Sequence, residues 1–390
     1  MTIQSSLFYG MAFARFAAMR TISKQHRPVS GTHTLADALD QPHNLLTPVR
    51  LLMALGVLLG HSFVVFLGNT GPEPLILFDI TISYAAVNGF FILSGLLITR
   101  SFDRRPDVVR FIVARALRLF PALIVLSLVA VMIFGPLFSS LGLMAYFSDL
   151  SVWRYLCDVL TFGDTSGGPP QIFPNNPWAG EFSASLWTLR FEVIAYGGSL
   201  ILGLLGLSRS RTRVLGVFVL SVLAFMAVRV MPADMLPAPF MDLTRLSMAY
   251  LLGATLYAWR DCVRISGRLA LGVTALALLF GPTASYEIML NFALAAGVLM
   301  VGFGLPVRFA PLARIPDLSY GIYIWQWPVM QSLYHLGMAS NPFIMMMLSL
   351  PISALIAAAS WYSIEKPALA YKTPLANWVL SRVILSRKTA

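Results

Sequence analysis

A histidine stands inside the first long apolar run of the chain. His61 lies within residues 51–67 (LLMALGVLLGHSFVVFL), and Arg50 precedes it by eleven residues. An ionisable side chain at membrane depth is costly, so it usually has a function or a specific partner. Imidazole gains and loses a proton near neutral pH, which makes His61 a candidate general base or nucleophile. A histidine packed in the core is the competing interpretation.

Glu192 is the candidate partner of His61. It lies near the start of another apolar run, which we expect to enter the membrane from the opposite side. At about 1.5 Å per residue and a hydrocarbon core of about 30 Å, both side chains fall at a similar depth, toward the outside. A carboxylate at this depth would orient an imidazole base. Alternatively, Glu192 forms a buried ion pair with Arg190 or Arg245.

A cluster of arginines follows the second apolar run. All the basic residues between positions 100 and 118 are arginine, namely Arg100, Arg104, Arg105, Arg110, Arg115 and Arg118. Arg115 and Arg118 are three residues apart, so they share a helix face. Guanidinium groups match phosphate oxygens, which makes this pair a candidate site for a phosphorylated ligand. A basic loop that only fixes the membrane orientation is the competing interpretation.

Composition predicts an all-α, polytopic membrane protein. Of 390 residues, 57% are hydrophobic and only 12% are charged, and the mean hydropathy is +0.75. The apolar runs are continuous and do not alternate, which excludes a β-barrel. About ten transmembrane helices are predicted. Their expected ranges are 47–67, 84–102, 117–138, 187–206, 213–230, 244–259, 269–283, 287–305, 318–336 and 343–362.

The net charge of +11 is distributed as a membrane protein requires. Arginines in short loops fall mostly on one side of the predicted spans, so the positive-inside rule places both termini in the cytoplasm. This distribution argues against nucleic acid as a partner. Cys157 and Cys262 lie in loops on opposite sides, so no disulfide is expected within the chain. No metal site is predicted.

Three segments surround or interrupt the spans. Residues 1–44 are predicted to be a cytoplasmic tail, partly disordered, and residues 45–368 to be the membrane domain. Residues 369–390 are predicted to be a cytoplasmic C-terminal tail whose basic and apolar residues suit the inner leaflet. Residues 139–186 form a long outer loop, of a length typical of functional lids or disordered segments.

Five motifs together resemble the acyltransferase 3 family of integral membrane acyltransferases. NGFFILSGLLITRSF and FIVARALRLFP, within residues 88–121, resemble its second and third helices. Arg50 and His61 match the Arg and His of its first helix at the same spacing. SLWTLRFE (residues 185–192), SYGIYIWQWPV (residues 319–329) and IEKP (residues 364–367) resemble further segments in the family's order.

The resemblance implies a ten-helix core, a cytoplasmic acyl-CoA donor such as acetyl-CoA, and a glycan acceptor on the other side. It carries over His61 as the catalytic residue, Arg115 and Arg118 as the donor-phosphate pair, and Glu192 as a functional carboxylate. Supporting roles fall to Arg50, Asn88, Tyr323 and Trp325. Asn88 departs from the Asp of many members. Gln326 replaces a frequent His, which puts a second histidine role there in doubt.

We therefore predict a multi-pass O-acyltransferase of the inner membrane that works on a surface polysaccharide or lipid-linked sugar. Acyl-CoA is expected as a substrate, with no bound cofactor, and a homo-oligomer is left open. His61 would act as general base or form an acyl-histidine; the sequence does not separate these. The rival function is a transporter or flippase for a glycan or lipid precursor. A purely structural scaffold leaves His61 unexplained.

Overall fold

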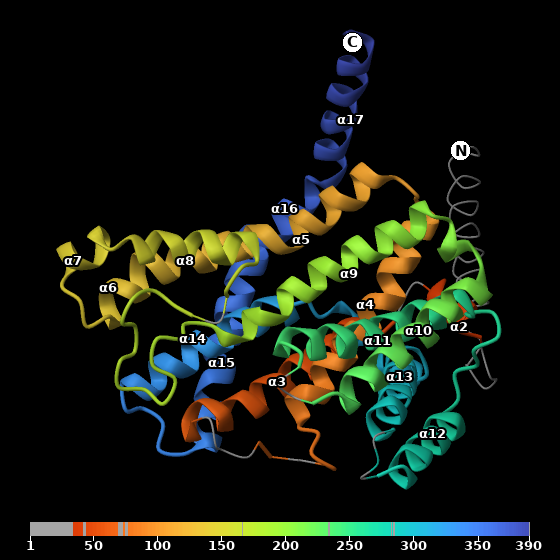
Figure 1. Ribbon diagram of the computed structural model, residues 1–390, viewed down its shortest axis with the longest axis horizontal. Coiled ribbons are helices and arrows are strands. Elements are labelled where there is room, and N and C mark those ends of the chain that lie inside the picture. The colour runs from red at the N-terminus through yellow and green to blue at the C-terminus, as the bar shows by residue number, and fades with distance from the viewer. Residues whose placement is uncertain are drawn as a thin grey trace, which may run out of the picture.

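The computed structural model describes residues 34–41, 44–68, 73–74, 77–165, 167–232, 235–281, 283 and 285–389, and over these it is helical without strands (Figure 1). The α-helices are α2 (Leu35–Leu39), α3 (Leu46–Leu67), α4 (Ile82–Arg104), α5 (Val108–Val129), α6 (Gly135–Phe138), α7 (Leu143–Ser148), α8 (Leu150–Thr161), α9 (Trp187–Leu204), α10 (Arg211–Val230), α11 (Ala238–Ala258), α12 (Gly267–Leu279), α13 (Tyr286–Phe303), α14 (Ser319–His335), α15 (Pro342–Ser360), α16 (Lys366–Ala370) and α17 (Lys372–Thr389).

Each of the ten predicted spans coincides with a helix. Within the described residues, six helical runs are long and apolar enough to cross a membrane, namely Leu46–Leu67, Ile82–Arg104, Val108–Phe138, Arg211–Val230, Tyr286–Phe303 and Pro342–Arg382. The other four predicted spans correspond to α9, α11, α12 and α14. Helices α12 and α14 are shorter, and α9 and α11 carry two charged residues each. The chain is thus a multi-pass helical protein, whereas the count of ten stays a prediction.

Helices α4 and α11 pack closely at the centre of the bundle. A Cβ atom at Gly95 would lie 1.8 Å from the carbonyl oxygen of Tyr250, and one at Gly253 would lie 1.9 Å from that of Ile92. Only glycine fits at these two positions, because the two backbones touch there. Small residues that permit such contact are typical of helix pairs in membranes.

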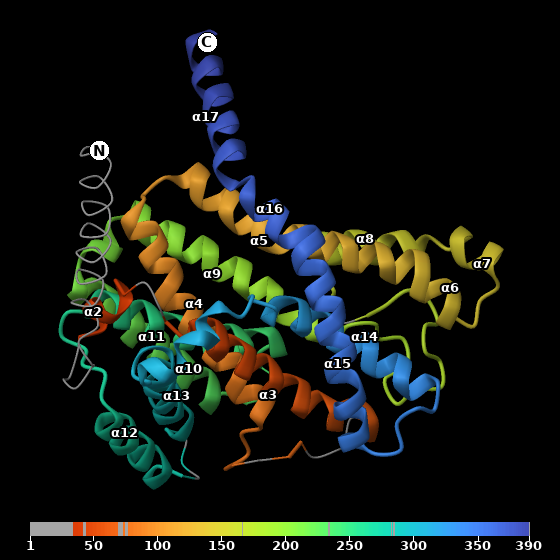
Figure 2. The ribbon, with the colours of Figure 1, turned by 180° about the vertical axis from the view of Figure 1, so that it is seen from behind.

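Helix α14 contributes to the two larger hydrophobic clusters of the described residues. It packs against α3 and α15, and its residues from Ser319 to Met330 are all buried. Ile322 and Trp327 belong to the cluster with α3 and α15, whereas Tyr323 and Trp325 belong to the larger cluster around α4 and α5. Figure 2 shows α3, α14 and α15 together on the back of the molecule. The motif SYGIYIWQWPV is therefore a core helix.

The long loop of residues 139–186 is folded rather than extended. It contains α7 and the amphipathic helix α8, which packs against α5 and buries Val152, Tyr155 and Val159. The rest turns tightly around Ile172, Phe173 and Phe182, each with no exposed surface. The length of this loop left two interpretations, a functional lid and a disordered segment. The packing favours the ordered one. Cys157 lies on α8 and is exposed, as is Cys262, and neither forms a disulfide.

The segments next to the spans are also helical where they are described. Helix α2 is fixed to the bundle because the backbone N–H of Leu35 donates to the carbonyl oxygen of Val263 at 2.8 Å. The predicted tail up to residue 33 lies outside the described residues. At the other end, α17 projects away from the bundle, and Arg110 of α5 donates to Asn377 at 2.9 Å (Figures 1 and 2).

Candidate active site

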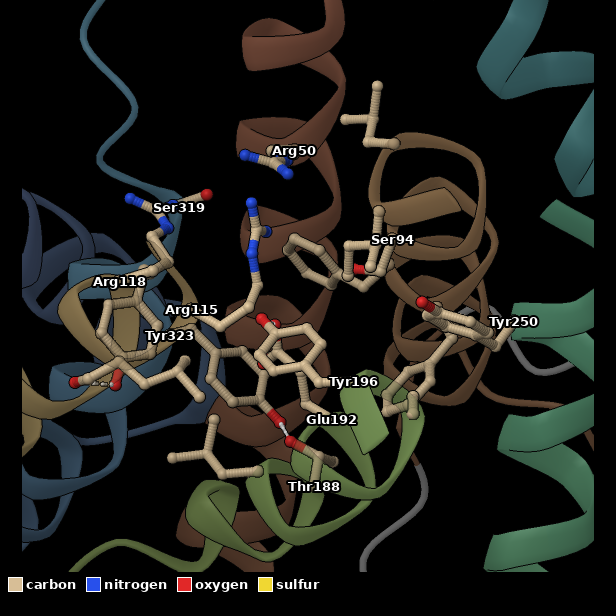
Figure 3. A pocket seen from close by; sticks show the side chains of 18 of the residues that line it. Arg50, Ser94, Arg115, Arg118, Thr188, Glu192, Tyr196, Tyr250, Ser319 and Tyr323 are labelled. Atoms are coloured by element: carbon tan, nitrogen blue, oxygen red, sulfur yellow. Dashed lines mark hydrogen bonds between the residues drawn. The ribbon is translucent and has the colours of Figure 1, made fainter. Parts of the chain in front are cut away.

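A cavity, partly open to solvent, lies among helices α3, α4, α5, α9, α11 and α14. Arginines gather at one end, and Thr188 and Tyr323 lie at the other (Figure 3). Apolar side chains and tyrosines form most of the wall between them. The lining includes Arg50, Phe90, Ser94, Arg115, Arg118, Thr188, Glu192, Tyr196, Tyr250, Ser319, Tyr320 and Tyr323. Four helix motifs that are far apart in the sequence thus meet around one space.

Arg50 and Arg118 share one carboxylate at the arginine end. Asp317 Oδ2 accepts from Arg50 Nη1 and from Arg118 Nη2, both at 2.8 Å, and Arg118 Nη1 lies 3.8 Å from Glu365 Oε2. Arg50 and Arg118 were expected from the sequence, but Asp317 and Glu365 were not assigned a role. Asp317 stands directly before α14 in a segment without a recognisable pattern, so only the fold reveals its position.

Asp317 is ionised and firmly held. Ser319 Oγ donates to Asp317 Oδ1 at 2.5 Å, and Asp317 lies just outside the first turn of α14. Burial acts to raise the pKa of Asp317, but Arg118 and Arg50 outweigh it and lower the pKa to about 2. The carboxylate therefore neutralises part of the positive charge of the two arginines at neutral pH.

Arg115 faces the cavity without such a carboxylate. Its Nε atom is buried and has no hydrogen-bond partner in the part of the chain that the structure describes. Its guanidinium carbon lies 5.7 Å from the ring centre of Tyr196 and 6.0 Å from that of Phe111. Aromatic faces hold the guanidinium plane and leave its N–H groups for another acceptor. Arg115 is thus the better placed of the pair to bind an added anion.

Glu192 lies in the same cavity, on α9, and accepts a hydrogen bond from Tyr196 one turn further along the helix. The alternative, an ion pair with Arg190 or Arg245, is not formed among the described residues: Arg245 Nη2 pairs with Asp242 at 3.1 Å, and Arg190 Nε donates to the Trp187 carbonyl. The structure brings Glu192 together with Arg115 and Arg118 around the cavity.

His61 contacts Trp327 of α14, which belongs to the hydrophobic cluster shared by α3, α14 and α15. Its ring meets the Trp327 ring edge to face, with centres 5.1 Å apart at 84°. The described lining of the cavity does not include His61, and no hydrogen bond joins it to Glu192 among the described residues. Phe90 lines the cavity and also packs against the hydrophobic cluster that contains Trp327, so the cavity and that cluster adjoin at this residue.

The supporting residues are placed as follows. Tyr323 lies at the end of the cavity opposite the arginines, where its hydroxyl is 2.7 Å from Thr188 Oγ1 and donates to the Ser185 carbonyl at 2.9 Å. Trp325 is buried in the core. Asn88 is outside the cavity lining, fully buried, and accepts from Arg245 Nη1 at 3.3 Å. The SLWTL and SYGIY motifs therefore meet at one end of the cavity, and Asn88 helps to hold a buried arginine.

A segment of the long loop of residues 139–186 packs on Trp327, the residue that His61 contacts. Trp178 packs against Trp327 with ring centres 5.5 Å apart, and its Nε1 donates to the Val64 carbonyl at 2.8 Å. Gln331 of α14 donates to the carbonyls of Trp178 and Glu181 at 2.7 and 2.8 Å, while Asn176 Nδ2 donates to Gln331 Oε1 at 2.9 Å. Residues 176–181 are therefore fastened over His61 and Trp327.

Comparison with known proteins agrees with this arrangement. The model of the acyltransferase 3 family, described as an acyltransferase domain, matches residues 47–364. The chain is 25% identical over 349 residues to an O-acetyl transferase of Shigella phage Sf6, covering 85% of this chain and 97% of the relative. It is 31% identical over 329 residues to nodulation protein 10 of Rhizobium leguminosarum bv. viciae, covering 76% and 85%. No solved structure matches the chain.

The chain therefore belongs to the acyltransferase 3 family and is a membrane acyltransferase. The predicted resemblance is confirmed over most of the membrane domain, and the match ends within the IEKP motif.

Proposed function

We propose that the protein transfers an acyl group, in the simplest case acetyl, from cytoplasmic acyl-CoA to a hydroxyl of an extracytoplasmic polysaccharide or lipid-linked sugar, in the inner membrane. The observation that carries this proposal is the cavity. It has arginines at one end and a largely apolar and tyrosine-lined wall, and one of its lining residues, Phe90, also packs against the cluster of Trp327, which contacts His61. A nucleotide with a long thin arm that ends in a thioester suits such a space.

The arginine end would hold the donor phosphates. Arg115 offers N–H groups that no described carboxylate occupies, and Arg118 keeps a positive charge beside it despite its contacts with Asp317 and Glu365. Charge-assisted hydrogen bonds from a guanidinium to phosphate are among the stronger contacts in proteins. The predicted sidedness of the arginine loops places this end at the cytoplasmic face.

The arm of the donor would run along the cavity toward Thr188 and Tyr323. Glu192 and Tyr196 present polar atoms to it halfway, which suits the amide groups of pantetheine. This assignment replaces the expectation that Glu192 orients His61. A shift of Phe90 would then join the thioester to His61.

His61 would carry the chemistry. As a general base it takes the proton of the acceptor hydroxyl while the oxygen attacks the thioester carbonyl, and the CoA thiolate leaves and is protonated. As a nucleophile it first forms an acyl-histidine that the hydroxyl then resolves. Both routes need a neutral imidazole close to the acceptor.

Two measurements test the proposal. Purified wild-type protein should bind acetyl-CoA in equilibrium dialysis, and a deletion strain complemented with the gene should carry ester-linked acetate on its envelope glycans, released by mild alkali. Absence of acyl-CoA binding together with altered glycan export in the deletion strain would favour the transporter instead. Unchanged ester content in the deletion strain would overturn the proposed acceptor class.

A further inference from the structure

Two rings in contact each carry a buried nitrogen atom that has no hydrogen-bond partner among the described residues. His61 Nδ1 and Trp327 Nε1 are both inaccessible, and within the described residues neither has a partner. Their rings are in edge-to-face contact, with centres 5.1 Å apart, and Trp327 is 3% exposed. A buried polar group left without a partner costs about 1–3 kcal/mol. An indole N–H is only a donor, whereas one nitrogen of a neutral imidazole is an acceptor.

A hydroxyl group is the smallest chemical group that satisfies both atoms at once. It has one O–H to donate and lone pairs to accept with. We infer that His61 and Trp327 form the binding site for the acceptor hydroxyl, whose O–H donates to His61 Nδ1 and whose oxygen accepts from Trp327 Nε1. This inference rests on the proposed function. It assigns to Trp327 a direct contact with the reacting oxygen and requires the His61 proton on Nε2.

The surroundings of the pair fit a group that enters from the outer side. Trp178 covers Trp327 from the outer loop, and the Gln331 contacts described above hold residues 176–181 in place. The donor cavity adjoins this cluster at Phe90, which lines the cavity and packs against the cluster that contains Trp327. An acceptor that reaches the pair beneath residues 176–181 would therefore meet the thioester from the side opposite to the arginines.

The pair also determines which acceptors are productive. A neutral amine has one lone pair, which cannot both accept from Trp327 Nε1 and attack the thioester, whereas a hydroxyl oxygen has two lone pairs and can do both. A site built to hydrogen-bond a substrate group discriminates strongly against analogues that cannot form the bond. The product is therefore an ester rather than an amide, and the acetyl group on the envelope glycans should be fully released by mild alkali.

Trp327→Phe tests the inference, because it keeps an apolar ring against His61 and removes only the N–H. In the complemented deletion strain, ester-linked acetate per amount of protein should fall about tenfold or more, the effect of one lost hydrogen bond at the reacting atom. Acetyl-CoA binding to the purified variant should stay within about twofold of wild type, since the donor cavity excludes Trp327. Retained donor binding also shows that the variant is folded.

Trp325→Phe is the matched variant. It removes a second buried indole N–H that has no partner among the described residues, two positions away on the same helix. Its loss of ester should be several times smaller. Equal losses in the two variants, full ester content in Trp327→Phe, joint loss of acetyl-CoA binding, or alkali-stable acetyl in wild type would each overturn the inference. Failure of the proposed function is distinct, because wild type itself would then add no ester.

Discussion

Arg115 and Arg118 stand three residues apart on α5, yet their guanidinium groups are held in different ways. Arg118 Nη2 donates to Asp317 at 2.8 Å and Nη1 faces Glu365, whereas Arg115 lies against aromatic rings with its Nε unpartnered among the described residues. One arginine of the motif therefore joins α5 to α14 and to the helical turn around Glu365, and the other is left for a ligand.

Lysine substitutions should separate these two roles. Arg115→Lys should weaken acetyl-CoA binding about ten- to a hundredfold, because lysine lacks the planar fork, with little change in thermal stability. Arg118→Lys should mainly lower the thermal midpoint, since one ammonium cannot reach two carboxylates. Equilibrium dialysis and thermal unfolding in detergent measure both. Arg110→Lys, on the same helix and bound to Asp107 and Asn377, is the control. Unchanged binding in Arg115→Lys would contradict the assignment.

Asp317 should make stability depend on acid. Its folded pKa of about 2 lies below the ordinary value of about 3.9, so its contribution is complete above that value and is lost as the pH falls through about 2. The Asp317→Asn variant should unfold at a lower temperature than wild type at pH 6. Its stability should also fall less than that of wild type as the pH is lowered, because it has no carboxylate to protonate at this position. Thermal midpoints at pH 6, 4 and 3 provide the measurement. Asp261→Asn, which removes an exposed ion pair with Arg211, should have little effect. If the thermal midpoint of Asp317→Asn changed with pH as that of wild type does, the result would argue against the shared ion pair.

His61→Ala should abolish most transfer but leave the protein in the membrane. Loss of a general base lowers rates about 10²–10⁴-fold, and a nucleophile is at least as important. Ester-linked acetate on envelope glycans measures the effect, at matched protein levels. Donor binding should persist, since His61 does not line the described cavity. Near-normal ester content in a well-expressed variant would exclude His61 from the chemistry.

Glu181 should make folding stability depend on pH in the direction opposite to Asp317. Burial, and then the neighbouring Asp164, raise the pKa of Glu181 to about 7. The folded state therefore keeps a proton that the unfolded state releases, and stability falls as the pH rises from about 4.3 to about 7. Glu181→Gln should raise the thermal midpoint at pH 8 and match wild type near pH 4. Proteolysis of the loop at the two pH values provides a second measurement. Equal thermal midpoints of Glu181→Gln and wild type at pH 8 would argue against a buried carboxylate at Glu181.

Membrane sidedness can be tested directly. From the arginine distribution, reporter fusions before Leu45 and after Pro367 should lie in the cytoplasm, and a fusion between Gly168 and Pro177 should lie outside. Cytoplasmic accessibility of the last fusion would reverse the proposed direction of transfer.

Helix positions followed from the sequence because apolar runs near twenty residues leave few alternatives. The loop of residues 139–186 was harder, since the amphipathic helix α8 is too short to resemble a span and becomes recognisable only when it packs on α5. Depth estimates along two helices placed His61 and Glu192 at one level. They did not give the rotation of each helix about its axis, and it is this rotation that turns Glu192 into the arginine-lined cavity and His61 toward Trp327. Asp317 had no sequence signal, because a single acid in a short connection acquires a role only through residues that are distant in the chain.

The backbone contact of α4 and α11 at Gly95 and Gly253 limits how the enzyme can move. Two helices that touch without side chains between them have no space to slide or rotate, so this pair is the fixed frame of the molecule. Opening for a long donor must then come from the opposite wall, where α5, α9 and α14 meet through side chains. Substitution of either glycine by alanine would consequently disturb the frame itself, whereas enlarging side chains on α9 would slow the opening.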